Sequence, residues 1–156
     1  MKASVKSTLS RATSECEKAG VRLTTKRLNV LAVLLAQPTA VSAYQVIDDY
    51  KSEFEESLQA MSAYRILNFL VEAGLAHRLE TTNRYIACSH INCDHAHEVP
   101  QFLICQFCHQ VIEVGLRSAL VEELRSSVRD TGFSLNEQQL ELHGVCQKCR
   151  KKPPKK

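Results

Sequence analysis

The sequence predicts an α+β fold in two parts, a mostly helical N-terminal part and a small α/β part stapled by zinc. The chain has 156 residues, of which 44% are hydrophobic and 24% charged, and this is ordinary globular composition. Apolar residues recur with helical spacing as far as Gly74 and with strand-like spacing after it. Cysteine and histidine are sparse before Tyr85 and crowded after it. We therefore expect a domain boundary between residues 88 and 100.

Two helices are predicted first. Residues 3–19 form a helix that stops at Gly20, since glycine commonly ends helices. Residues 25–37 form the second, with Thr24 or Thr25 as its N-cap and Pro38 beyond its end.

Two more helices follow a short link. Ser42 and Gln45 have the spacing of a capping box, which predicts that a third helix opens there. Ser62 is a possible N-cap for a fourth helix, over residues 63–74, stopped by Gly74.

Two strand-like runs, residues 75–80 and 84–88, then flank the turn sequence Thr-Thr-Asn and predict a hairpin. Helices, a short link, a polar-faced helix and a hairpin are the order of a winged helix-turn-helix. We assign this domain to residues 1–88.

The second part reads as three short strands and one helix. The strands cover residues 102–105, 111–114 and 139–144, and the helix covers 118–132. Such a core is small to stand alone, so metal binding and dimerisation are expected to supplement it. We assign residues 89–100 to a hinge with metal ligands, 101–150 to the dimerisation domain and 151–156 to a disordered basic tail.

Two Cys-x-x-Cys pairs give the strongest chemical motif in the sequence. They are Cys105 with Cys108, and Cys146 with Cys149. Each pair follows a predicted strand, and four thiolates can bind one zinc ion tetrahedrally at about 2.3 Å. The alternatives are two redox pairs or cysteines that are simply core residues. The seven cysteines are an odd number, which argues against a closed set of disulfides.

A second group of metal-binding residue types surrounds the expected hinge. Thiolate, imidazole and carboxylate together suit a borderline-soft ion such as zinc. The alternative is a solvated polar loop with scattered histidines. The group consists of His77, Cys88, Cys93, His95, His97 and Glu113.

The fourth helix is the candidate DNA-reading element. In a winged fold its exposed N-terminal half enters the major groove, where Tyr64 and Arg65 reach base edges or phosphates. The alternative is a solvated helical face. Flanking phosphates are expected to meet Arg22, Lys26, Arg27 and Arg84. Cys16, in the first helix, is expected to be a buried thiol.

Other function classes are disfavoured. No segment approaches the roughly 18 apolar residues of a membrane span, and the N-terminus lacks the apolar stretch of a secretory signal, so a cytoplasmic location is expected. The net charge of +3 permits nucleic-acid binding without demanding it. A zinc hydrolase or deaminase is the alternative of another class. Deaminases use H-x-E, whereas here His95, His97 and Glu98 do not give that pattern. Four cysteines would also leave no open position for water.

These motifs together resemble the ferric uptake regulator (Fur) family, and within it the zinc uptake regulator branch. The likeness runs from about Arg22 to Cys149. Its segments are VRLTTKRLNVL, SAYQVIDDY, SAYRILNFLVEAGLAHRLE, TNRYIAC, FLICQFCHQVIEV and LHGVCQKC.

The resemblance implies a homodimeric, zinc-responsive repressor that binds double-stranded operator DNA of zinc-uptake genes and has no small-molecule substrate. It implies two zinc ions per monomer. The four paired cysteines match the structural site, while His77, Cys88, His97 and Glu113 match the sensing site, with His95 or Cys93 as alternative ligands. Tyr44 joins Arg65 as a DNA contact. A regulator of the same family that senses iron, manganese or peroxide is the alternative, against which Cys88 argues because the iron and manganese relatives use nitrogen and oxygen ligands at this site.

Overall fold

The structure is a computed structural model that describes residues 3–91, 100–134 and 139–151. The chain divides into two compact units, Met1–Cys93 and Asp94–Lys156. We call them unit 1 and unit 2 and describe each by itself.

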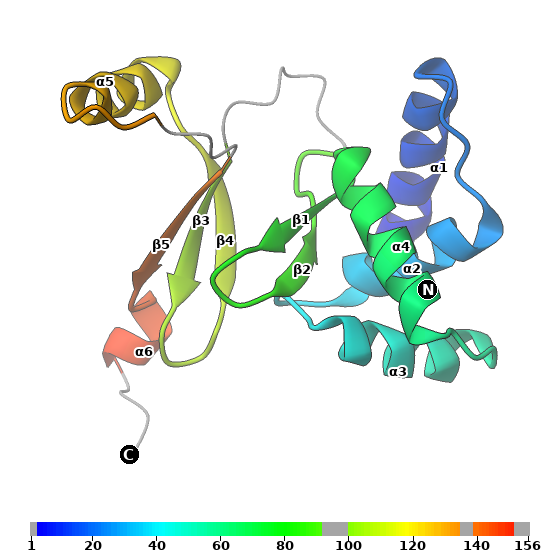
Figure 1. The fold of residues 1–156 in the computed structure, drawn as a ribbon. Coiled ribbons are helices and arrows are strands. Elements are labelled where there is room, and N and C mark those ends of the chain that lie inside the picture. Colours follow the sequence, from blue (N-terminus) through cyan, green and yellow to red (C-terminus); the bar gives the residue numbers. More distant parts are fainter. Residues whose placement is uncertain (1–2, 92–99, 135–138, 152–156) are drawn as a thin grey trace. The chain divides into compact units, whose positions relative to one another are not determined.

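Unit 1 contains four helices and one hairpin (Figure 1). The capping box predicted at the start of α3 is confirmed: the Gln45 amide donates to Ser42 Oγ at 3.2 Å, and the Ser42 amide donates to Gln45 Oε1 at 3.0 Å. The elements are α1 (Ala3–Lys18), α2 (Thr25–Ala36), α3 (Ala43–Phe54), α4 (Ala60–Glu72), β1 (Ala76–Leu79) and β2 (Arg84–Ala87).

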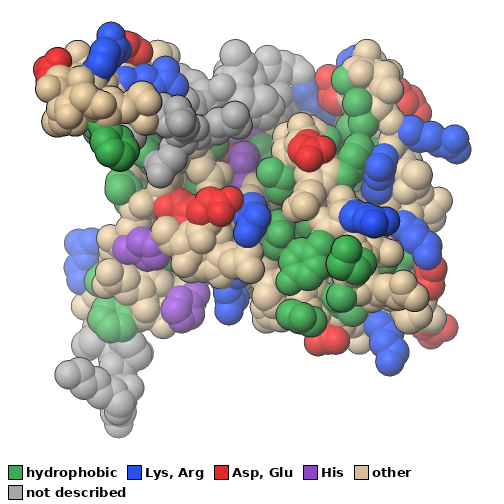
Figure 2. Space-filling model, in the orientation of Figure 1, with side chains coloured by type: hydrophobic (Ala, Val, Ile, Leu, Met, Phe, Trp, Pro, Cys, Tyr) green, Lys and Arg blue, Asp and Glu red, His purple; other side chains and the backbone are tan. Residues whose placement is uncertain are grey.

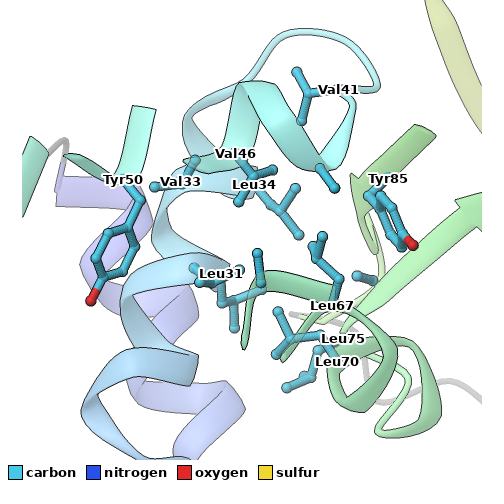
Figure 3. Close-up of a cluster of buried hydrophobic side chains, with 14 of the residues drawn as sticks. Leu31, Val33, Leu34, Val41, Val46, Tyr50, Leu67, Leu70, Leu75 and Tyr85 are labelled. Carbon is cyan, nitrogen blue, oxygen red and sulfur yellow. The ribbon is translucent and has the colours of Figure 1, made fainter. Parts of the chain in front are cut away.

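The core of unit 1 lies where α2, α3 and α4 meet the hairpin (Figure 3). Leu31 and Leu34 of α2 pack with Leu67 of α4, and Tyr85 enters the cluster from β2. All four side chains are almost completely buried. Burial of each such side chain stabilises the fold by about 2 kcal/mol relative to exposure, so this cluster fixes how the helices pack.

The hairpin is attached to the link between α2 and α3. Its strands are antiparallel, with His77 opposite Ile86. Val41, in the link, exchanges two backbone hydrogen bonds with Tyr85, at 2.9 and 2.7 Å. Three helices with a hairpin joined in this way form the winged helix-turn-helix that the sequence predicts.

Unit 2 is a three-stranded sheet in the order β4–β3–β5, with helices α5 and α6 (Figure 1). Strand β3 pairs antiparallel with β4 and parallel with β5. The elements are β3 (Pro100–Cys105), β4 (Val111–Gly115), α5 (Ser118–Arg129), β5 (Leu140–Gly144) and α6 (Gln147–Lys151). The α+β fold class is thus confirmed.

Two local expectations are wrong. Ser62 is not the N-cap of the fourth helix, because α4 begins at Ala60 with Gln59 as its cap residue. Leu58 is buried in the core just before it, which anchors the chain early enough for Ala60 and Met61, both good helix formers, to be helical. Lys151, assigned to the tail, is the last residue of α6, a helix that the sequence analysis missed. Residues 152–156 lie outside the described part.

Within the described residues, none of the helices combines the length and apolar character needed to cross a membrane.

Candidate metal centres and nucleic-acid interface

The strand order of unit 2 brings the two Cys-x-x-Cys pairs together. Cys105 is the last residue of β3, and its parallel neighbour in the register is Gly144, the last residue of β5. Because parallel strands end at the same edge of a sheet, the turn after β3 and the turn after β5 are adjacent. Two backbone hydrogen bonds hold this edge: the Gln106 amide donates to the Gly144 carbonyl at 2.9 Å, and the Cys105 amide donates to the Gln110 carbonyl at 2.9 Å.

The four sulfur atoms of these pairs all lie within 4.8 Å of one another. The Sγ atoms of Cys108 and Cys146 are 3.6 Å apart, too far for a disulfide and close to the roughly 3.8 Å between ligands of a tetrahedral Zn–S₄ centre. Cys105 is buried, Cys146 and Cys149 are half-buried, and Cys108 is exposed. The donor set and its spacing fit a closed metal site of the structural kind.

The electrostatics of this group also suit a cation. The backbone amides of Cys108 and Cys146 donate hydrogen bonds to Cys105 Sγ, the latter at 3.4 Å. These bonds, of which that from Cys108 has the larger effect, lower the pKa of Cys105 to about 6. Burial, reinforced by hydrogen bonds with the other three sulfurs, raises the pKa of Cys149 to about 12. Without a cation, therefore, the Cys105 thiol ionises easily, whereas ionisation of the Cys149 thiol is strongly unfavourable. A divalent ion makes that ionisation favourable, because it offsets the repulsion among the thiolates.

The second group lies at the open end of the hairpin in unit 1. His77 is on β1 and Cys88 directly follows β2, and a ring nitrogen of His77 lies within 4.8 Å of Cys88 Sγ. The Cys88 amide donates to the Leu75 carbonyl at 3.0 Å, which fixes the residue at the end of the strand pair. Cys88 is 3% exposed. A soft and a borderline ligand thus lie side by side.

The other expected members of this second group are Glu113, which belongs to unit 2, and three residues of the segment between two described parts. Glu113 lies on β4 of unit 2, half-buried, opposite Phe102 of β3. The ligands expected at His95, His97 and Cys93 lie outside the described residues. Cys16 is buried on α1, as expected.

The predicted DNA-contacting residues all belong to unit 1, and four of them are exposed, Lys26 among them. Tyr44 is 65% exposed in the first turn of α3, and Arg65 is exposed on α4. Arg22 is exposed before α2, whereas Tyr64 is half-buried and packs against the core. Figure 2 shows Lys and Arg side chains spread over the face of this unit that is in view.

The other three basic residues also make structural contacts. Lys26 forms an exposed ion pair with Glu56 at 2.7 Å. The Arg84 guanidinium donates to the Ala40 carbonyl at 3.1 Å, beside the bridge between Val41 and Tyr85. Their charges are therefore less available to a phosphate than the sequence suggests.

Arg27 contacts both Phe69 and Arg22. Its guanidinium carbon lies 3.4 Å from the centroid of the Phe69 ring on α4, and its Nη1 donates to the Arg22 carbonyl at 2.7 Å. This side chain connects the start of α2 to α4 through a cation–π contact.

The sequence analysis missed one basic residue of the hairpin. Arg78 lies on β1, and its Nε donates to Asn83 Oδ1 at 3.1 Å across the turn. Asn83 has a φ of 49°, a left-handed conformation that asparagine tolerates better than most residues. Burial along β1 does not alternate, since Ala76, two residues before Arg78, is buried, so strand alternation gave no signal for Arg78.

The chain matches known proteins over most of its length. Residues 18–143 match the model of the Ferric uptake regulator family. The "Zinc uptake regulation protein" of Escherichia coli (strain K12) is 34% identical over 141 residues, which are 90% of this chain and 80% of that protein. The "Peroxide operon regulator" of Bacillus subtilis (strain 168) is 30% identical over 150 residues, 92% of this chain and 94% of that protein. A solved "Zinc Uptake Regulator Complexed With Zinc AND DNA" superposes with a TM-score of 0.83 at 30% identity, over 96% of this chain and 97% of the other.

Proposed function

Because the chain belongs to the ferric uptake regulator family, we propose that it is a zinc-responsive, DNA-binding transcriptional repressor of zinc-uptake genes. The observation that carries this proposal is the placement of Cys88 beside His77 at the base of the wing, the β1–β2 hairpin. The similar zinc regulators, one of them solved with zinc and DNA, support it. The family is one of transcription regulators and not of enzymes, and we place the protein in the cytoplasm with its DNA target.

The first of two proposed zinc ions per monomer is structural. Cys105, Cys108, Cys146 and Cys149 bind it, and its bonds tie the ends of β3 and β5 to α6. Helix α6 has no buried residue, so it has little apolar packing of its own to hold it against the strands. The stability of unit 2 therefore depends on the site, as in other small domains held by zinc.

The second zinc site is the sensor. His77 and Cys88 supply two ligands from the wing, and Glu113 with His97 completes the set, His95 and Cys93 being the alternatives. A thiolate favours zinc over iron or manganese, which prefer nitrogen and oxygen ligands. Bound zinc supplies a cross-link between its ligands. Its ligands then restrict how the wing moves relative to the strand that carries Glu113. The equilibrium among the conformations of the protein therefore shifts toward the one that binds DNA.

The protein acts as a homodimer formed through unit 2. Leu103 of β3 pairs with Ile112 of β4 and with Leu142 of β5, so the three side chains form one row across the sheet. They are 40%, 46% and 50% exposed, and Leu120 and Leu124 of α5 are also exposed. A contiguous exposed apolar surface is typical of an interface. A second copy buries it and brings two winged domains onto one palindromic site.

The winged domain reads the operator through α3 and α4. Tyr44 and Arg65 are the proposed base or phosphate contacts, since both side chains are exposed, and Tyr64 supports them from the half-buried side of α4. Arg22, Lys26, Arg27 and Arg84 line the flanks, where their remaining donors can meet phosphates.

The test is operator binding at buffered free metal, with wild type and Cys88→Ser compared. Wild type should bind a zinc-uptake operator with zinc and weakly with iron or manganese, whereas Cys88→Ser should fold, keep one zinc and lose the zinc response. Cys16→Ser is the matched control, because it removes a buried thiol elsewhere. An unchanged zinc response in Cys88→Ser, or a stronger response to iron, manganese or peroxide, would contradict the proposal.

A further inference from the structure

The turn that follows β2 places a backbone amide against the thiol of Cys88. The N–H of His90 donates to Cys88 Sγ, with 3.4 Å between nitrogen and sulfur. We propose that this N–H positions the Cys88 thiolate and sets the zinc affinity of the sensing site. The inference rests on the proposed function, because it concerns the same site.

The contact belongs to a fixed piece of backbone. On one side of the sulfur, the Cys88 amide is bound to the Leu75 carbonyl at 3.0 Å. On the other side, the His90 amide reaches back over two residues to the sulfur. Cys88 and Ile91 are both buried in the core of unit 1, at 3% and 8% exposure, so the intervening turn is anchored at both ends. The His90 N–H therefore lies at a set place beside the thiol before any ion arrives.

Unit 2 uses the same device at its four-cysteine site. There the Cys146 amide donates to Cys105 Sγ, also at 3.4 Å. A hydrogen bond to the charged form of a ligand favours that form, and groups of this kind around a metal typically alter its affinity 10- to 100-fold. The His90 N–H lies at the same distance from Cys88 Sγ, 3.4 Å, as the Cys146 N–H does from Cys105 Sγ.

The effect of the His90 N–H on zinc binding must be distinguished from that of the His90 imidazole. The ring Nδ1 lies 3.3 Å from Ser89 Oγ, so the side chain has a neighbour of its own. His90→Ala removes the imidazole and keeps the N–H, whereas His90→Pro removes both. The pair of variants isolates the N–H, and the His90→Ala variant is the matched control.

The experiment measures zinc affinity in the full chain by competition with a chelator of known affinity. His90→Pro should weaken binding of the second zinc about tenfold or more, and His90→Ala should leave it within about threefold of wild type. Cobalt(II) provides a second readout, since loss of the N–H should shift the sulfur-to-cobalt charge-transfer band of that site. If His90→Pro does not fold, lactate replacing residue 90 by semisynthesis removes the N–H while adding no ring.

Two results would overturn the inference. Either His90→Ala weakens zinc as much as His90→Pro, which assigns the effect to the imidazole, or the N–H-free variants keep wild-type affinity and the wild-type cobalt band. Failure of the proposed function is distinct, because wild type itself would then bind a single zinc, or Cys88→Ser would retain the second one.

Discussion

Replacement of Arg27 by alanine should destabilise the winged domain even in the absence of DNA. The guanidinium lies 3.4 Å from the Phe69 ring centroid, a cation–π contact that contributes about 1 kcal/mol at a half-exposed position. Its hydrogen bond to the Arg22 carbonyl, at 2.7 Å, contributes about 1 kcal/mol more. Arg27→Ala should therefore lower the free energy of unfolding of unit 1 by about 2 kcal/mol.

Tyrosine signals measure this unit separately. The chain has four tyrosines and no tryptophan, and all four tyrosines lie in unit 1, at positions 44, 50, 64 and 85. Urea unfolding followed by near-UV circular dichroism thus reports this domain. A double-mutant cycle of Arg27→Ala with Phe69→Leu should give a coupling energy of about 0.5–1 kcal/mol. If Arg27→Ala left the urea midpoint unchanged and only weakened operator binding, Arg27 would be a phosphate contact and the structural role would be refuted.

Three further changes test other parts of the molecule. Gly74→Ala should lower the free energy of unfolding by about 1 kcal/mol in the same urea assay, because Gly74 has a φ of +67°, which alanine adopts only with strain. An added methyl group would meet nothing within 4 Å, so the cost comes from the backbone alone, and an unchanged midpoint would contradict this argument. Glu56 has a pKa lowered by its hydrogen bond from Lys26, so its contribution is present above its unfolded pKa and is lost as pH falls through the folded pKa. Glu56→Gln should accordingly reduce the loss of thermal stability between about pH 5 and pH 3, and equal acid sensitivity would argue against the pair. Leu103→Asp should raise the dimer dissociation constant at least about tenfold in analytical ultracentrifugation, because it places a charge in the exposed apolar row; a dimer of unchanged affinity would exclude that face.

The sequence predicted best what local chemistry determines. The capping box of Ser42 and Gln45 depends on residues three apart, and it was placed correctly. The prediction of Ser62 as an N-cap was wrong because a serine inside the first turn cannot be told from a serine at the cap by sequence alone. The burial of Leu58 places the start of α4 at Ala60. The helix α6 was missed because its five residues give no apolar period.

In the candidate sites, too, the features set by local sequence could be predicted and those set by tertiary packing could not. The spacing of the two Cys-x-x-Cys pairs is enough to predict a four-sulfur group. The parallel pairing of β3 with β5 brings the pairs to one edge of the sheet, and this pairing cannot be predicted from either segment because it is non-local. The basic residues of unit 1 look equivalent in sequence. Their differences arise from packing, since Arg27 lies over Phe69 whereas Arg65 points outward on the same helix as that ring.

The most direct test of the account is a zinc titration of the metal-depleted, refolded protein, with bound zinc and operator anisotropy recorded on the same samples. We expect the first equivalent per chain to bind without any change in anisotropy, and operator binding to rise only with the second. Operator binding complete at one zinc per chain, or absent at two, would contradict the claim that the site of His77 and Cys88 controls the repressor.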